Sequence, residues 1–230
     1  MIDFHSHILP HMDDGSKSVE ESLKMLEMLS QQGVSRVIAT PHFNANSETV
    51  RHFINRRTVS FENLKSHISQ EHPEILIGAE VKYYQGISRL ENLRELCIEK
   101  SNILLLEMPS CKWSEYIVSE LVDMSGSGLN VVLAHVERYM FFQSSAIMER
   151  LFHCGVYFQF NSEFFISRFS RRKAFKMMKN QMVGPIGSDC HNLESRPPNI
   201  GEAVELIEKK FGKSFIYRYE KFLENLFVQN

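Results

Sequence analysis

Short apolar runs alternate along the chain with longer segments whose apolar residues recur at helical spacing. The runs end at glycine, proline or polar residues, as buried strands do, and they lie at 1–4, 34–40, 75–77, 103–106, 130–134, 156–161 and 183–187. The intervening patterns predict helices at 18–33, about 49–70, 113–125, 144–153, 168–179, 199–211 and 214–227. A further helical stretch is predicted between the third and fourth strands.

This alternation of strand and helix, repeated about seven times, indicates parallel strands joined by helical crossovers. Seven such units are enough for a closed or nearly closed barrel, so the predicted fold is an α/β (β/α)7 barrel of the TIM-like type. The chain has no linker, low-complexity tract or internal repeat. We therefore expect one domain over residues 1–230.

Side chains able to bind a metal follow six of the predicted strands. In a βα barrel the carboxyl ends of the strands meet at one face, so these side chains should converge. Each taken alone is more often an ordinary hydrogen-bonded polar residue, but their recurrence at six strand ends favours a metal site. The candidate ligands, with one from the first loop, are His5, His7, Asp14, His42, Glu80, Glu107, His135, Asp189 and His191.

Nine nitrogen and oxygen donors exceed what one ion binds. They suit two or three ions, with a carboxylate such as Glu80 bridging. No cysteine belongs to the set, and mixed histidine and carboxylate ligands favour manganese, iron, cobalt or zinc.

Two arginines follow the same strand ends. Arg138 lies three residues after His135, and Arg196 lies five residues after His191. A guanidinium group offers a rigid fork of donors that matches phosphate oxygens. Although either arginine alone is as often a surface residue, two of them beside a multi-metal site favour a phosphate ester as substrate.

The sequence also contains a motif of a different class of phosphatase. Cys190 and Arg196 have the Cys-x5-Arg spacing of phosphatases in which a thiolate attacks phosphorus. The residues between them contain no glycine and include an acid, and Pro197-Pro198 follows. Such a loop is poorly suited to binding an anion through its backbone amides. A metal-dependent mechanism is therefore favoured over a cysteine-dependent one.

The bulk composition sets limits on partners and location. The net charge of −2 over 230 residues gives no reason to expect nucleic-acid binding, and no apolar run has the length of a membrane span. The chain does not open on a signal-like segment, and its four cysteines form no Cys-x-x-Cys pair. We expect a cytoplasmic protein without membrane insertion.

The segments HSHILPHMDDG, ATPHF, GAE, LLLEMP, AHVERY, FQFNS and GSDCHNLESRPP occur in this order. Together they resemble the PHP (polymerase and histidinol phosphatase) superfamily, and within it the bacterial manganese-dependent protein-tyrosine phosphatases of capsule and exopolysaccharide synthesis. The resemblance implies a distorted (β/α)7 barrel with three metal ions. It assigns one ion to His5, His7, Glu80 and Asp189, a second to Glu80, Glu107 and His135, and a third to Asp14, His42 and His191.

The resemblance also implies the reaction and the partner. Arg138 and Arg196 would hold the phosphate while a metal-bound hydroxide attacks phosphorus, with Mn²⁺ as the expected cofactor. The substrate would be a tyrosine-phosphorylated protein, namely a bacterial tyrosine autokinase or a related protein in capsule synthesis. The residues themselves identify no general acid.

Three alternatives remain open at this point. The first is a small-molecule phosphomonoesterase of the same superfamily, such as a histidinol phosphatase. The second is a nuclease-like phosphodiesterase, which would need a basic groove that the sequence does not show. The third is a scaffold that binds phosphotyrosine without turnover, which would require one of the metal-binding residues to be missing, and none is. The loops 43–48, 82–88 and 109–114 should determine which of these substrates is accepted. Their aromatic residues could stack on a phenyl ring, although aromatic loop residues more often pack: Phe43, Tyr83, Tyr84 and Trp113.

Some segments depart from the family or carry other patterns. His11 stands where the family usually has glycine, Val136 where proline is common, and the segment 161–189 is short. A basic segment could steer an acidic phosphoprotein, although a solvated helix face is the commoner explanation; its residues are Arg168, Arg171, Arg172, Lys173, Lys176 and Lys179. The aromatic residues of 215–227 are expected to pack in the core.

Overall fold

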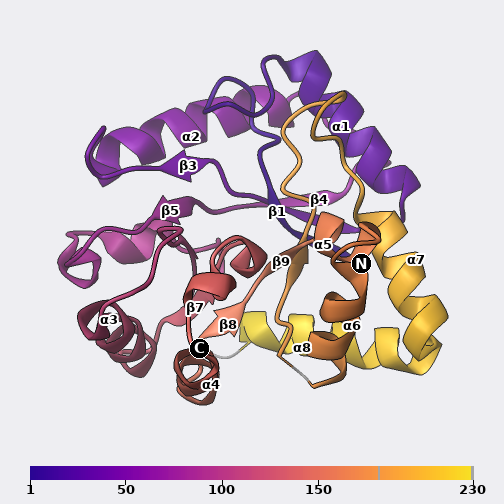
Figure 1. The fold of residues 1–230 in the computed structure, drawn as a ribbon. Coiled ribbons are helices and arrows are strands. Elements are labelled where there is room, and N and C mark those ends of the chain that lie inside the picture. The colour runs from indigo at the N-terminus through magenta and orange to yellow at the C-terminus, as the bar shows by residue number, and fades with distance from the viewer. Residues whose placement is uncertain (181, 229–230) are drawn as a thin grey trace.

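Parallel strands lie side by side around a central axis in the computed structural model, which describes residues 1–180 and 182–228 (Figure 1). The hydrogen-bonded orders are β1-β2-β4, β3-β5-β6-β7-β8 and β9-β10, and every pair is parallel. The strands are β1 (Ile2–Ser6), β2 (Arg36–Ala39), β3 (His42–Phe43), β4 (Glu74–Ile77), β5 (Glu80–Lys82), β6 (Ile103–Glu107), β7 (Asn130–Leu133), β8 (Tyr157–Phe158), β9 (Phe160–Asn161) and β10 (Ile186–Gly187).

At three strand positions a break separates two short strands, and the second strands of two of these pairs, β3 and β5, lie beyond the predicted ranges 34–40 and 75–77. β2 and β3 are separated by Thr40 and Pro41, β4 and β5 by Gly78 and Ala79, and β8 and β9 by Gln159. Each broken strand still occupies one position between its neighbours, because β2 pairs with β4 and β3 pairs with β5. The predicted seven-strand plan is thereby retained.

Backbone hydrogen bonds join the last strand position to the first. The amide of Asp189 donates to the carbonyl of His5 at 2.8 Å, and the amide of His7 donates to the carbonyl of Cys190 at 2.9 Å. The ring of strands is therefore closed, and the expected α/β barrel is confirmed. Closure also places the two ends of the sequence's metal-ligand pattern, near residues 5–7 and 189–191, against each other.

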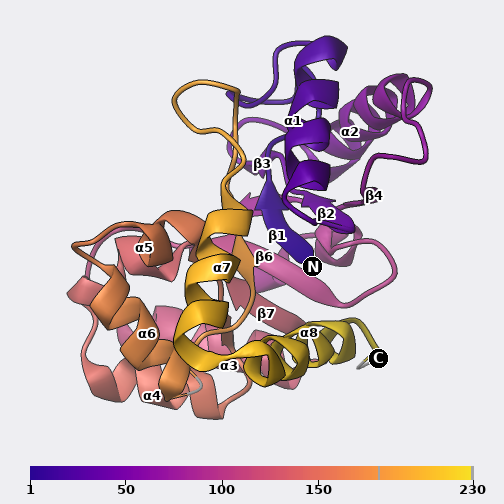
Figure 2. The same ribbon diagram turned by 90° about the vertical axis from the view of Figure 1, so that its right-hand side faces the viewer.

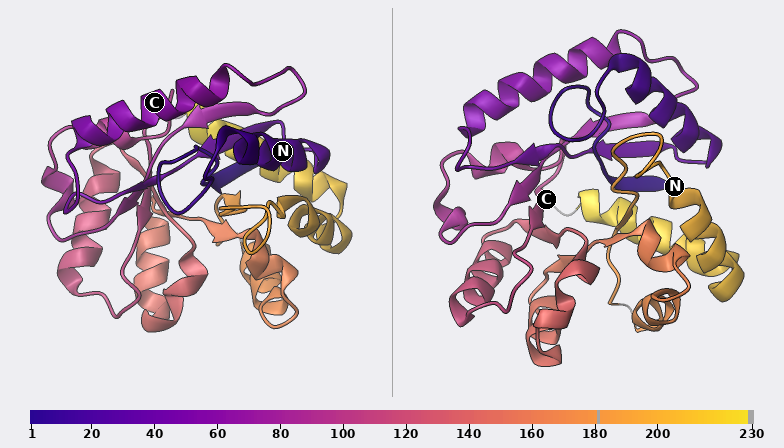
Figure 3. Two further views of the ribbon diagram at one scale, coloured as in Figure 1. Left: turned by 90° about the horizontal axis from the view of Figure 1, so that it is seen from above. Right: turned by 45° about the horizontal axis from the view of Figure 1, so that its top comes forward.

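Helices surround the strands on the outside of the barrel (Figures 1 and 3). The first helix begins where its capping-box pattern predicts, because the Ser18 hydroxyl accepts a hydrogen bond from the Glu21 amide at 3.1 Å. Within the described ranges, no helix combines the length and apolarity needed to cross a membrane. The helices are α1 (Val19–Gln31), α2 (Val50–Lys65), α3 (Glu115–Gly126), α4 (Ser145–His153), α5 (Ser162–Ile166), α6 (Arg171–Lys179), α7 (Ile200–Phe211) and α8 (Lys213–Val228).

The helical segments differ from the predictions at three places. The stretch after Glu80 contains two 3-10 turns, Ile87–Arg89 and Leu93–Leu96, because Gly86 and Asn92 before them adopt positive φ and interrupt a continuous helix. The helix expected to reach residue 70 ends at Lys65. The short helix α5 was missed, and α6 begins only at Arg171 because residues 167–170 form a turn that Ser170 closes onto the Phe164 carbonyl at 2.8 Å.

Two apolar layers occupy the two faces of the strands. The outer layer packs strands against helices such as α1, α2 and α3. The inner layer is formed by alternate strand residues, for example Ile38, Leu105 and Val132, together with Leu223 and Leu226 of α8. α8 runs beneath the amino-terminal ends of the strands and closes that end of the barrel (Figure 2). The opposite, carboxyl-terminal end is the one left for polar side chains.

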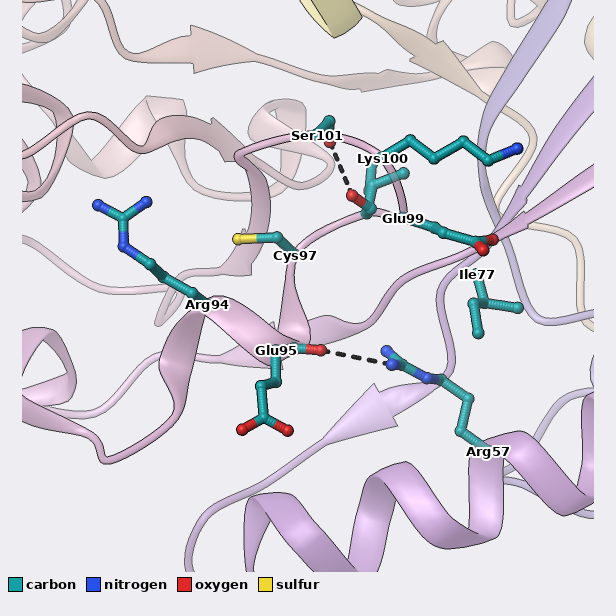
Figure 4. A pocket seen from close by; sticks show the side chains of 9 residues that line it. Arg57, Ile77, Arg94, Glu95, Cys97, Glu99, Lys100 and Ser101 are labelled. Atoms are coloured by element: carbon teal, nitrogen blue, oxygen red, sulfur yellow. Dashed lines mark hydrogen bonds between the residues drawn. The ribbon is translucent and has the colours of Figure 1, made fainter. Parts of the chain in front are cut away.

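An arginine from α2 supports the break between β4 and β5. Arg57 is buried and donates to the carbonyl of Gly78 at 2.7 Å. It also donates to the carbonyl of Glu95 at 3.3 Å (Figure 4). At Gly78 an added Cβ would lie 3.0 Å from Ile98, so the backbone approaches this neighbour closely. The break is therefore held from both sides two residues before Glu80, the first residue of β5.

Replacing Leu226 by alanine should destabilise the protein by about 2–4 kcal/mol, because it leaves a cavity in the inner layer. The same substitution at Tyr217, which is 63% exposed on the same helix, should cost well under about 1 kcal/mol. Denaturant unfolding of both variants measures the difference. Equal losses would show that α8 does not close the barrel as described.

Candidate metal centre

The structure brings all nine predicted ligand residues together at the carboxyl-terminal mouth of the barrel. β1 carries His5, β3 carries His42, and β5 and β6 carry Glu80 and Glu107. His7 follows β1 directly, and Asp14 comes from the loop after it. The remaining three follow the ends of β7 and β10 and are His135, Asp189 and His191.

Four donor atoms form the deepest part of the site. His5 Nε2 and His7 Nε2 are 3.1 Å apart, and Glu80 Oε2 lies 3.2 and 3.3 Å from them. Asp189 Oδ1 lies 3.6 and 3.5 Å from the same nitrogens. Two nitrogens bound at about 2.1 Å to one ion and roughly at right angles to each other would also lie about 3 Å apart. The geometry therefore matches donors that share a cation.

Glu80 also contacts the rest of the cluster. Its Oε1 is 2.7 Å from His135 Nε2, which is 3.9 Å from Glu107 Oε1. Its Oε2 is 2.9 Å from His42 Nδ1. Since one carboxylate faces donors on several sides, it has the placement of a bridging ligand.

Asp14 lies at the open edge of the cluster. Its Oδ1 is 3.4 Å from both His42 Nε2 and His191 Nε2, and its side chain is 66% exposed. Donor atoms within 4.8 Å of one another form three overlapping groups: His7, Asp14, His42 and His191; His5, His7 and Glu80; and His42, Glu80 and Glu107. The number of ions and the division of the ligands among them stay predictions.

Acceptors behind the histidines orient their rings. His7 Nδ1 is 2.8 Å from Asp13 Oδ2, and His5 Nδ1 is 3.2 Å from Gln159 Oε1. His191 Nδ1 is 2.9 Å from the carbonyl of Asp189. When Nδ1 donates to such an acceptor, the Nε2 lone pair is free to bind a metal.

These orienting residues were not predicted. Asp13 is adjacent to the predicted ligand Asp14, and only the geometry shows that Asp13 faces the ring of His7 while Asp14 faces the cluster. Gln159 falls in the break between β8 and β9, within the segment FQFNS, but the sequence does not show which side chains it faces. It also accepts from the amide of His135 at 2.7 Å, so it ties two ligand segments together.

The electrostatics of the cluster call for positive charge. Burial alone would raise the pKa of Glu80, but His5, His135 and His42 hold it well below its usual range. Glu80 Oε2 and His191 Nε2 are buried without a hydrogen-bond partner among the described residues. Buried atoms of this kind are costly unless an ion or another partner satisfies them. The donor set therefore fits divalent cations, with the nitrogen and oxygen chemistry of manganese, iron, cobalt or zinc.

The two predicted arginines lie beside the cluster and converge on one carboxylate. Arg138 Nη2 donates to Asp189 Oδ2 at 2.6 Å, and Arg196 Nη2 forms an ion pair with the same oxygen at 2.7 Å. Asn161 Nδ2 donates to the same oxygen at 2.8 Å. Both arginine side chains remain partly exposed, at 44% and 37%, and line a cleft of about 620 Å³ together with Asp189.

The thiolate alternative does not fit the structure. Cys190 is fully buried, and burial raises the pKa of its thiol far above the usual range, with the negative charge of Asp3 adding to the effect. A thiol with these properties neither ionises readily nor reaches a substrate. Its backbone instead closes the barrel through the bond from His7.

Most of the proposed aromatic rim packs inward. Phe43, Tyr83 and Trp113 are buried, and only Tyr84 stays partly exposed. The hydroxyl of Tyr83 donates to Glu120 at 2.7 Å, so it ties its loop to α3. The burial of these three agrees with packing, the commoner role of aromatic residues in loops, and not with stacking on a substrate ring.

His11 is exposed and has a φ of +60°. That conformation favours glycine over other residues, which gives a physical reason for the glycine expected at this position from the resemblance.

A ligand cluster at the carboxyl-terminal mouth of a parallel barrel, with arginines at its rim, defines a metal-dependent hydrolase. Known proteins agree with this class. The sequence profile of the family described as "Capsular polysaccharide synthesis, CpsB/CapC" matches residues 1–227. The chain belongs to this family, whose related members are metal-dependent tyrosine phosphatases, and the resemblance noted in the sequence is confirmed.

Individual relatives span nearly the whole chain. Tyrosine-protein phosphatase CpsB of Streptococcus pneumoniae is 31% identical over 100% of this chain and 96% of its own length. Tyrosine-protein phosphatase YwqE of Bacillus subtilis is 29% identical over 94% of this chain and 87% of its own length.

Solved structures agree with the family and the fold. A chain from the crystal structures of YwqE from B. subtilis and CpsB from S. pneumoniae, described as unique metal-dependent tyrosine phosphatases, superposes with a TM-score of 0.81 at 25% identity, covering 100% of this chain and 95% of that one. A putative histidinol phosphatase from Listeria monocytogenes shares only the fold, with a TM-score of 0.51 at 12% identity over 92% of this chain and 100% of that one.

Asp13→Asn should lower metal affinity by about 10- to 100-fold, because the ring of His7 loses the carboxylate that orients it. Asp123→Asn, at an exposed position of α3, is the matched control and should bind metal as the parent does. Metal content after dialysis and calorimetric titration measure the effect. Parent-like affinity in Asp13→Asn would contradict the assigned role.

Proposed function

We propose that this protein is a metal-dependent protein-tyrosine phosphatase that acts on a bacterial tyrosine autokinase or a related phosphoprotein and thereby regulates capsule or exopolysaccharide synthesis. Membership of the CpsB/CapC family supports the substrate class. The observation that carries the proposal is the pair Arg138 and Arg196, which converge beside a cluster of nine candidate metal-binding side chains.

The proposed ligands are the nine residues predicted from the sequence. His5, His7, Glu80 and Asp189 would hold one Mn²⁺; Glu107 and His135, with Glu80 shared, would hold a second; and Asp14, His42 and His191 would hold a third. Bound divalent ions would lower the pKa of water and neutralise charge on the phosphoryl group.

The protein's own residues would bind and orient the ester. Each guanidinium group offers five N–H donors, and one nitrogen of each is paired with Asp189. The remaining N–H donors are therefore available to phosphate oxygens. The pairing with Asp189 would keep both guanidinium groups oriented toward the cleft. This preorganised pair would be complementary to the charge on the transferring phosphoryl group.

The shape of the cleft supports an aryl phosphate on a protein. The donors at the base, such as His5 and Glu80, are fully buried, whereas Arg138 and Arg196 are partly exposed at the rim. A phosphate must therefore extend inward from a partner that stays outside, and a tyrosyl ring supplies that length. A phenolate leaving group, with a pKa near about 10, also needs less protonation than an alkoxide does, in keeping with the absence of an identified general acid.

The decisive assay compares a phosphotyrosyl peptide, the same peptide with phosphoserine, and histidinol phosphate. Chelation should remove more than about 90% of the activity, and added Mn²⁺ should restore it, because the buried donors require cations. We expect the phosphotyrosyl peptide to be the best substrate. Activity that survives chelation would refute the metal-dependent mechanism, and a preference for histidinol phosphate would establish the small-molecule alternative.

Arg196→Lys should lower kcat/KM for the phosphotyrosyl peptide by about 100-fold, because lysine keeps the charge but loses the fork of donors. Metal content should stay unchanged, since Arg196 is not a ligand. Arg94→Lys, an exposed arginine outside the cleft, is the control and should retain full activity. A parallel loss of metal and activity in Arg196→Lys would show that the arginine acts through the cluster instead of the phosphate.

A further inference from the structure

A basic groove lies beside the catalytic cleft and takes no part in the chemistry described above. It has a volume of about 550 Å³ between α6 and the end of α7. Its lining contains six cationic side chains, two aromatic ones and no acidic one: Arg168, Arg171, Arg172, Phe175, Lys176, Lys179, Lys210 and Phe211.

The cations of this groove lack counter-charges. Among the described residues none of the six forms an ion pair, and all except Arg171 are exposed. Arg171 instead donates to the carbonyls of Phe165 and Ile166, which fixes it at the start of the groove. The helix α6 places five basic residues and no acidic residue in Arg171–Lys179. Such a concentration of unpaired charge is unusual in a chain with a net charge of −2.

The groove and the cleft share one wall. Ser167 and Ser170 line the cleft that contains Arg138 and Arg196, while Arg168 in the same turn and Arg171 directly after it line the groove. Phe169, in the turn between the cleft and the groove, is fully exposed at 101%. A polypeptide whose phosphotyrosine enters the cleft can therefore cross this turn and continue along α6.

We propose that the groove binds an acidic segment of the phosphoprotein substrate, adjacent in sequence to the phosphotyrosine. This inference rests on the proposed function and adds how the substrate is selected. Nine helical residues span about 12 Å, which accommodates about four residues of an extended chain. Aspartate, glutamate or a second phosphate in those positions would face the six cations, and the half-buried rings of Phe175 and Phe211 would contact the chain between them.

The test uses two phosphotyrosyl peptides of equal length, with four glutamates or four glutamines beside the phosphotyrosine. The acidic peptide should have a KM about three- to tenfold lower at low salt with the same kcat, and 0.5 M salt should remove the advantage. Arg172→Glu/Lys176→Glu should abolish the preference while leaving kcat/KM for p-nitrophenyl phosphate unchanged. Lys24→Glu/Lys65→Glu makes the same change in net charge on α1 and α2 and should keep the preference.

Equal KM values for the two peptides, or equal effects of the two double variants, would overturn the proposal. A second readout does not depend on turnover: binding of the unphosphorylated acidic peptide, followed by fluorescence anisotropy, should be lost only in Arg172→Glu/Lys176→Glu. Binding without hydrolysis of any phosphotyrosyl ester would refute the proposed function and retain the groove's specificity. Tighter binding to phosphatidylglycerol vesicles than to the acidic peptide would assign the groove to a lipid surface and refute the inference.

Discussion

The carboxylate of Glu80 is buried at the base of the barrel mouth. Its two oxygens lie within 3.3 Å of nitrogens from four imidazole rings. An ionised carboxylate in such a place is stable only if positive charge and hydrogen-bond donors surround it. The histidines supply part of that charge, and Glu80 Oε2, still without a hydrogen bond, has a lone pair for a cation. The break after β4, supported by Arg57, is what brings Glu80 to this position.

Closure of the barrel determines how the metal-binding side of the site meets the phosphate-binding side. Because the residues after β10 hydrogen-bond to the end of β1, Asp189 lies against His5 and His7 through one oxygen. Its other oxygen forms ion pairs with Arg138 and Arg196. One carboxylate would thus couple the position of the proposed cations to the position of the proposed phosphate donors. A change in the barrel's seam would therefore disturb both at once.

The candidate ligands could be predicted from the sequence because all except Asp14 follow a short apolar run, and such runs are local patterns that can be recognised without the fold. The breaks within strands and the 3-10 turns were not predictable in this way, since they depend on contacts such as Arg57 with Gly78. Gln159 was missed for the same reason, because its two partners come from β1 and the end of β7. Tyr83 was assigned to the rim because the sequence does not show that Glu120, on a later helix, holds its hydroxyl.

Net charge says little about local charge, because it sums groups that are screened from one another by salt beyond about 8–10 Å. The mouth of the barrel gathers carboxylates, and a phosphate dianion is repelled by these until cations and the two arginines compensate. The basic residues of α6 lie across a single turn from that mouth, without acidic partners. A substrate with acidic neighbours would therefore be attracted first to the groove, where its charge is matched, and its phosphotyrosine would then be held close to the cleft. Affinity for the protein segment and chemistry on the phosphate would reside on two adjoining surfaces.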